Sequence, residues 1–79
     1  MTPAQCRAAR ALLDWTQPKL AESASLGLST VVDFERERRA VSEDAAQSIR
    51  SALEGAGVIF VAENGEGPGV RLKKKKHRK

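Results

Sequence analysis

The chain has 79 residues, enough for one small domain with a modest core. Its 14 basic and 10 acidic residues give a net charge of +4, but seven of the basic residues lie in the segment 71–79. Residues 1–70 therefore carry a net charge of −3, and the basic composition describes a tail rather than the expected folded part. No apolar run of about 18 residues is present, which excludes a membrane span.

The N-terminus and the cysteine content indicate a cytoplasmic protein. The sequence MTPAQCRAAR lacks the basic and then apolar pattern of a secretion signal. The single cysteine, Cys6, cannot form an internal disulfide, and no metal-binding spacing surrounds it. We expect no metal and no cofactor. We also do not expect an enzyme, because the chain has no nucleophile-and-base set and no phosphate-binding glycine loop.

The first helix is predicted over residues 3–14. Thr2 and Gln5 form a capping box, and Pro3 suits the first helical position. Trp15 is expected to close the core at the following corner. Four apolar residues recur at helical spacing and predict a buried stripe: Cys6, Ala9, Leu12 and Leu13.

Three more helices are predicted before residue 58. The second covers 17–25 behind the N-cap Thr16, and it buries Leu20, Ala21 and Ala24. The third covers 28–36. The fourth follows Ser42 and ends at one of two glycines, Gly55 or Gly57. The expected stripe of the fourth helix contains Ala45, Ala46, Ile49, Ala52 and Leu53.

The remaining chain predicts a short β segment. Residues 58–62 form a β-branched and aromatic run, 63–69 a turn-rich loop and 70–72 a second short strand. A lone hairpin is marginal in water, so either the helices or a second chain must cover it. The first alternative is a cap on the helical core, and the second is a homodimer. The dimer would form through Val58, Ile59, Phe60 and Val61.

These predictions give a mainly α fold, a four-helix domain followed by a short C-terminal strand or hairpin. We divide the chain into a helical domain at 1–57, a β segment at 58–72 and a basic tail at 73–79. The second and third helices, joined by a tight turn, form a candidate helix-turn-helix from Thr16 to Arg39.

The third helix is predicted to have two different sides. Val31 and Phe34 fall on one side, which suits packing on the other helices. The opposite arc of about 140° is small, mixed and reachable, as a base-reading surface needs to be. That arc contains Leu28, Ser29, Val32, Asp33 and Arg36.

The segment 17–36 resembles the helix-turn-helix of the phage-repressor/Cro-like (Xre-type) DNA-binding family. The matching positions are Gln17, Leu20-Ala21, Ser29-Thr30-Val31 and Phe34-Glu35-Arg36, within a resemblance that covers about residues 5–54. The resemblance implies a cytoplasmic, sequence-specific DNA-binding transcriptional regulator, often found in phages and mobile elements. It also implies a homodimeric repressor or autoregulator on an inverted repeat with half-sites about 34 Å apart.

The resemblance also assigns roles to individual residues. It implies that Leu28, Ser29, Val32 and Asp33 face the base edges. It implies phosphate contacts for Gln17, Arg36, Arg38 and Arg39. It implies an internal ion pair between Arg10 and Glu35, for which the alternative is two solvated surface charges.

The chain departs from the family pattern at and near the third helix. Gly27 replaces the usual Ser or Thr N-cap, and Glu37 stands where Gly is common. Leu28 and Val32 are apolar and suit thymine methyl groups. Asp33 suits a cytosine amino group but repels a nearby phosphate.

The tail and the acidic folded part leave alternatives open. The tail is either a solvated terminus or a cationic arm on DNA phosphates through Lys73, Lys74, Lys75 and Lys76. The acidic Asp33 and Glu37 motivate a different function, a protein-interaction module that kept the fold and binds a protein partner. The resemblance also allows an antitoxin, for which the C-terminal strand and tail are the candidate toxin-binding segment.

Overall fold

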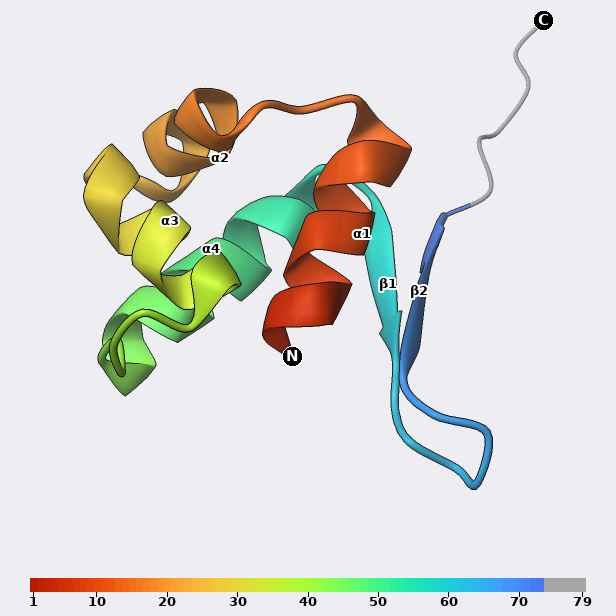
Figure 1. The fold of residues 1–79 in the computed structure, drawn as a ribbon. Coiled ribbons are helices and arrows are strands. Elements are labelled where there is room, and N and C mark those ends of the chain that lie inside the picture. Colours follow the sequence, from red (N-terminus) through yellow and green to blue (C-terminus); the bar gives the residue numbers. More distant parts are fainter. Residues whose placement is uncertain (74–79) are drawn as a thin grey trace, which may run out of the picture.

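The computed structural model describes residues 1–73 and confirms the mainly α fold (Figure 1). Four helices are followed by a two-stranded antiparallel hairpin. In chain order the elements are α1 (Pro3–Leu13), α2 (Gln17–Ala24), α3 (Leu28–Arg36), α4 (Glu43–Gly55), β1 (Val58–Val61) and β2 (Gly69–Leu72). The predicted element bounds agree to within one residue, and α4 ends at Gly55, the first of its two predicted stop signals.

Local side-chain chemistry sets the helix starts. The Thr2 hydroxyl accepts from the Gln5 amide at 3.0 Å, and Gln5 Oε1 accepts from the Thr2 amide at 2.8 Å. Thr16 and Ser42 cap α2 and α4 in the predicted way. The helices α1 and α2 end one residue before the predicted bounds because Asp14 and Ser25 adopt left-handed backbone conformations, with φ of 62° and 59°.

The core lies between the four helices, and Val58 of the hairpin adds to it. The predicted inner residues of α2 are buried, but Leu12 of α1 is 43% exposed, so its predicted burial is wrong. At 100° per residue Leu12 lies about 60° beyond Ala9, at the margin of the stripe. The buried apolar residues are Cys6, Ala9, Leu20, Ala21, Ala24, Val31, Ile49, Leu53 and Val58.

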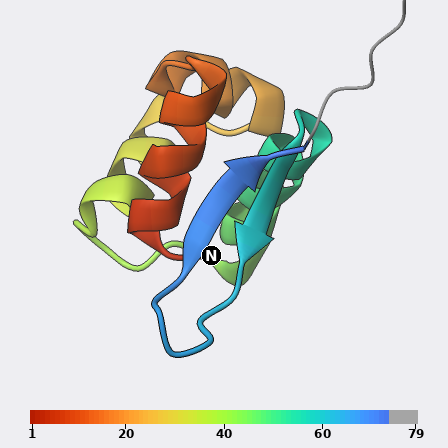
Figure 2. The ribbon, with the colours of Figure 1, turned by 90° about the vertical axis from the view of Figure 1, so that its right-hand side faces the viewer.

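The hairpin lies against the helices, with β2 beside α1 and β1 toward α4 (Figure 2). Phe60 pairs with Val70, and both pack against the core. Gln5 Nε2 donates to the carbonyl oxygens of Val61 at 3.2 Å and Gly69 at 2.9 Å. The same glutamine therefore caps α1 and joins it to the loop end of the hairpin, where Val61 pairs with Gly69. No helix within residues 1–73 has the length and apolar character needed to cross a bilayer.

Candidate nucleic-acid interface

The turn between α2 and α3 is short and fixed by backbone hydrogen bonds. Ser25 reverses the chain, and the Leu26 amide donates to the Ala21 carbonyl at 2.9 Å. Gly27 is the N-cap of α3 but offers no side-chain oxygen, so the first amides of α3 lack a side-chain cap. This arrangement leaves the N-terminal end of α3 open at the surface.

The predicted base-reading residues share the outer side of α3. Leu28 is 46% exposed, Ser29 is exposed, and Val32 and Asp33 are half-buried. Val31, on the opposite side, is fully buried in the core. The structure therefore brings the four predicted readers onto one accessible surface, which we call the α3 reading surface: Leu28, Ser29, Val32 and Asp33.

A fully buried carboxylate holds the last turn of α3 in place. Glu35 has no exposed surface, and Arg10 donates to it twice, from Nε at 2.7 Å and from Nη2 at 2.8 Å. Gln17 Nε2 donates to Oε1 at 2.9 Å, and the Cys6 thiol donates to Oε2 at 3.1 Å. Arg7 donates to the Glu35 backbone carbonyl. One carboxylate thus connects α3 to both α1 and the start of α2.

The hydrogen bonds at Glu35 determine its ionisation. Burial by itself raises the pKa of Glu35, but hydrogen bonds from Arg10, Cys6 and Gln17 outweigh it, and the pKa lies below its ordinary value of 4.5. The hydrogen bond to Glu35 raises the pKa of Arg10. Burial, followed by the contact with Glu35, raises the pKa of Cys6. The site therefore holds an anionic carboxylate, a cationic guanidinium and a neutral thiol.

Gln17, for which we expected a phosphate contact, makes an internal contact in the structure. Its side-chain amide nitrogen points inward to Glu35, which needs donors because it is buried and charged. Sequence reasoning missed both Gln17 and Cys6 as partners of Glu35. For Cys6 a signal was present: it lies four residues before Arg10, so the two share one face of α1.

The three predicted phosphate-contacting arginines lie at the end of α3 and in the turn that follows. Arg36, Arg38 and Arg39 are all exposed. Within residues 1–73, Arg36 and Arg38 form no ion pair, whereas Arg39 Nε lies 2.7 Å from Asp33 Oδ2. An ion pair therefore joins Asp33, which was predicted to contact bases, to Arg39, which was predicted to contact phosphates.

The tail is described only at its first residue. Lys73 is exposed, and its backbone amide donates to the Gly57 carbonyl at 2.6 Å. The predicted phosphate contacts Lys74, Lys75 and Lys76 lie outside the described residues.

The four predicted dimerisation residues differ in how accessible they are. Val58 is only 3% exposed because it packs on the helices of its own chain, and Phe60 is half-buried there. Ile59 is 37% exposed and Val61 is half-buried. Val58 and Phe60 therefore fit the alternative expectation, in which the strand covers the helical core. Ile59 is the member of the set with most surface left for a partner.

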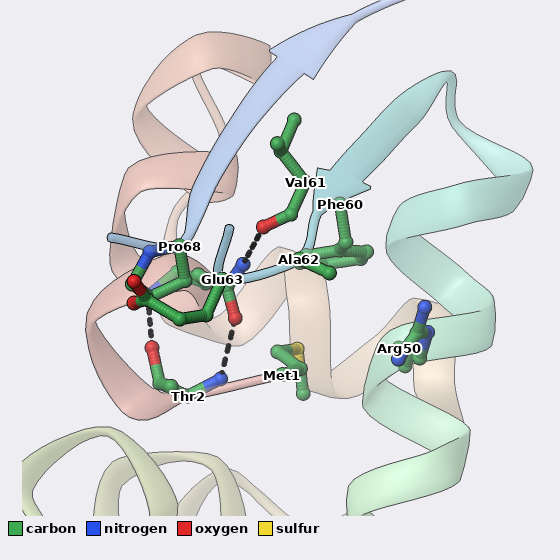
Figure 3. Close-up of a pocket in the computed structure, with 9 residues that line it drawn as sticks. Met1, Thr2, Arg50, Phe60, Val61, Ala62, Glu63 and Pro68 are labelled. Carbon is green, nitrogen blue, oxygen red and sulfur yellow. Dashed lines mark hydrogen bonds between the residues drawn. The ribbon is translucent and has the colours of Figure 1, made fainter. Parts of the chain in front are cut away.

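A separate pocket of about 420 Å³ opens between the start of α1, α4 and the hairpin (Figure 3). The Arg50 guanidinium lies 5.2 Å from the centre of the Phe60 ring at this pocket. None of the predicted DNA-contacting residues lines it. Its walls are formed by Met1, Thr2, Gln5, Arg50, Phe60, Val61, Ala62, Glu63 and Pro68.

The described residues contain no cluster of three His, Cys, Asp or Glu side chains arranged to hold a metal ion. Comparison with protein-family models gives no match. None of the curated proteins matches the chain significantly. The candidate interface consists of the α3 reading surface, the buried Glu35 network behind it and the arginines at the C-terminal end of α3.

Proposed function

We propose that the chain is a DNA-binding transcriptional regulator that inserts α3 into the major groove. The observation that carries this proposal is the contrast between the two sides of α3. Its inner side is locked through buried Val31 and Glu35, and its outer side presents the α3 reading surface. A rigid helix with a small, accessible outer side meets the geometric need of direct base readout.

The charge distribution supports the same assignment. Arg36 and Arg38 are exposed at the end of α3, where a groove-bound helix comes close to the DNA backbone. Residues 1–70 carry a net charge of −3, so these arginines and the basic tail must supply the attraction to phosphate. We propose a homodimeric repressor or autoregulator in the cytoplasm that reads an inverted repeat, because one small helix contacts few base pairs.

An antitoxin or other protein-interaction module is the second candidate. The observation that favours it is the acidic character near α3, where Asp33 and Glu37 lie beside the arginines. A protein partner with a basic surface would suit this pattern better than a phosphate backbone would.

A gel-shift experiment on DNA upstream of the gene tests the first proposal. The wild type is expected to bind this DNA more tightly than a scrambled competitor over a series of salt concentrations. The double variant Ser29→Ala/Asp33→Ala is expected to change the sequence preference while the helical content persists. Ser51→Ala, on the exposed surface of α4, is the matched control and should preserve the preference. Binding that is indifferent to competitor sequence would contradict base reading by α3.

A further inference from the structure

We propose that Arg39 is a positioning residue for base recognition, which holds the Asp33 carboxylate as an acceptor for the amino group of cytosine. This inference rests on the proposed function and specifies the chemistry that the α3 reading surface recognises. It also changes the role of Arg39, which the resemblance assigned to phosphate. Its basis is the contact between Arg39 Nε and Asp33 Oδ2, at 2.7 Å.

The turn after α3 fixes this contact. Glu37 adopts a left-handed conformation, with φ of 55°, and ends the helix. The Arg38 amide then donates to the Asp33 carbonyl at 3.0 Å, which closes the turn back over the last residues of α3. The chain therefore returns Arg39 to the surface that carries Asp33. The contact therefore depends on the backbone turn as well as on the reach of the long Arg39 side chain.

The ion pair resolves the electrostatic difficulty of an acidic residue in a DNA groove. An unpaired carboxylate on α3 would be repelled by the phosphates that flank the major groove. Arg39 offsets that charge locally. Within residues 1–73, Asp33 Oδ2 is bonded to Arg39, and no hydrogen bond engages Oδ1. The Asp33 side chain is 17% exposed, so its direction is restrained while one oxygen is left to accept a hydrogen bond.

The acceptor-only character of this oxygen selects among the bases. In the major groove cytosine presents an amino donor, whereas guanine presents two acceptors and thymine an acceptor and a methyl group. Adenine also has an amino donor, but its N7 acceptor lies next to it and would face the carboxylate. A fixed carboxylate therefore favours cytosine at the position that Asp33 contacts.

Arg38 provides a matched control for Arg39. The two arginines are adjacent and exposed, but within residues 1–73 only Arg39 is part of an ion pair. If Arg39 acts through Asp33, its loss must change base discrimination. If Arg38 contacts phosphate, its loss must lower affinity for all sequences alike and reduce the salt slope by about one.

The test begins with selection of binding sites by the full-length wild type from a randomised duplex pool. Affinities are then measured for the selected site and for the three substitutions at each of its positions. Arg39→Gln is expected to lose about tenfold or more of the preference for cytosine at one position. Arg38→Gln is expected to retain that preference. Asp33→Asn is expected to lose it as well, and Arg39→Gln should have little further effect in the Asp33→Asn background.

The possible outcomes separate this inference from the proposed function. A wild type that selects no motif contradicts the proposed function, and the inference fails with it. A selected motif whose cytosine preference survives Arg39→Gln overturns the inference alone. A preference at the Asp33-dependent position for any base other than cytosine also overturns it. The unfolding midpoint of each variant shows whether the fold is retained, and Asp33→Asn tests the same preference if Arg39→Gln does not fold.

Discussion

The Arg10 guanidinium and the Glu35 carboxylate face each other through two hydrogen bonds, of 2.7 Å and 2.8 Å, between residues 25 positions apart in the chain. This paired geometry is the strong form of the Arg–carboxylate contact. Because Glu35 lies in the last turn of α3 and Arg10 lies on α1, the pair restrains α3 against α1. The orientation of the α3 reading surface therefore depends on a contact behind it.

Removal of Arg10 is expected to destabilise the domain strongly. Arg10→Met leaves the Glu35 carboxylate with no exposed surface and without its cation, which typically costs about 3–5 kcal/mol. The measurement is the free energy of unfolding in urea, followed by circular dichroism. Glu54→Ala removes the exposed pair of Arg50 and Glu54, at 3.0 Å, and should cost less than about 1 kcal/mol. Similar losses of unfolding free energy in the two variants would show that the buried pair contributes no more to stability than the exposed pair.

The lowered pKa of Glu35 predicts a loss of stability in acid. In the unfolded chain this carboxyl takes up a proton near its ordinary pKa of 4.5, and in the folded chain it does so only at lower pH. Below about pH 4.5 the unfolded state therefore binds more protons, and Glu35 contributes a decrease of up to about 1.4 kcal/mol per pH unit. The stability that the lowered pKa of Glu35 supplies is fully present above about pH 4.5 and is lost as the pH falls through the folded-state pKa.

A comparison with Glu35→Gln isolates this contribution from the other carboxylates. The difference in unfolding free energy between wild type and variant should be constant near neutral pH and should shrink below about pH 4.5. Urea titrations at several pH values provide the measurement. A difference that does not change between neutral and acidic pH would mean that the folded and unfolded carboxyls have the same pKa.

Gln5→Glu is expected to loosen the hairpin without breaking the cap of α1. Glutamate suits the third position of a helix and can still accept from the Thr2 amide. It has no hydrogen atoms to donate to the carbonyls of Val61 and Gly69, which should lower the local opening free energy of the strands by about 1–3 kcal/mol.

Amide hydrogen exchange resolves the effect of Gln5→Glu by segment. Exchange should accelerate in β1 and β2 and remain unchanged in α2. Gln47→Glu is the matched control, because Gln47 is exposed on α4 and, among residues 1–73, its side chain bonds only the nearby Ser51 hydroxyl. Equal protection of the strands in the wild type and in Gln5→Glu would indicate that the hairpin is held by its apolar contacts alone.

Short-range signals explain how much of the fold was predictable. Caps at Thr2, Thr16 and Ser42 and the apolar spacing placed the helices to within one residue, with the end of α4 left open between Gly55 and Gly57. The strands followed from a β-branched and aromatic run and from the loop residues after it. The outer side of α3 followed from helical periodicity alone, and the structure has the Arg10–Glu35 pair that the resemblance implied. The exposure of Leu12 could not be read so directly, because Leu12 lies at the margin of the apolar stripe, where helical periodicity alone does not decide burial.

The contacts that sequence reasoning missed depend on backbone turns and on long-range packing. The Asp33–Arg39 pair requires the left-handed turn at Glu37, a conformation that residues other than glycine adopt infrequently. The inward direction of Gln17 depends on the position of Glu35, 18 residues later. Periodicity indicates which side of a helix a residue occupies, but it does not indicate which distant group that residue meets.

Truncation after Lys73 tests the basic tail as a phosphate-binding arm. It removes five lysine and arginine residues and keeps the Lys73 amide that bonds to the Gly57 carbonyl of the hairpin. If all five contact phosphate, the slope of log affinity against log salt should flatten by about 4.5. Discrimination between the selected site and its variants should persist, because phosphate contacts carry no sequence information. A full-length control with Lys74, Lys75 and Lys76 changed to glutamine should give an intermediate slope. An unchanged slope in both proteins would show that residues 1–73 supply the electrostatic attraction without the rest of the tail, although residues 1–70 carry a net charge of −3.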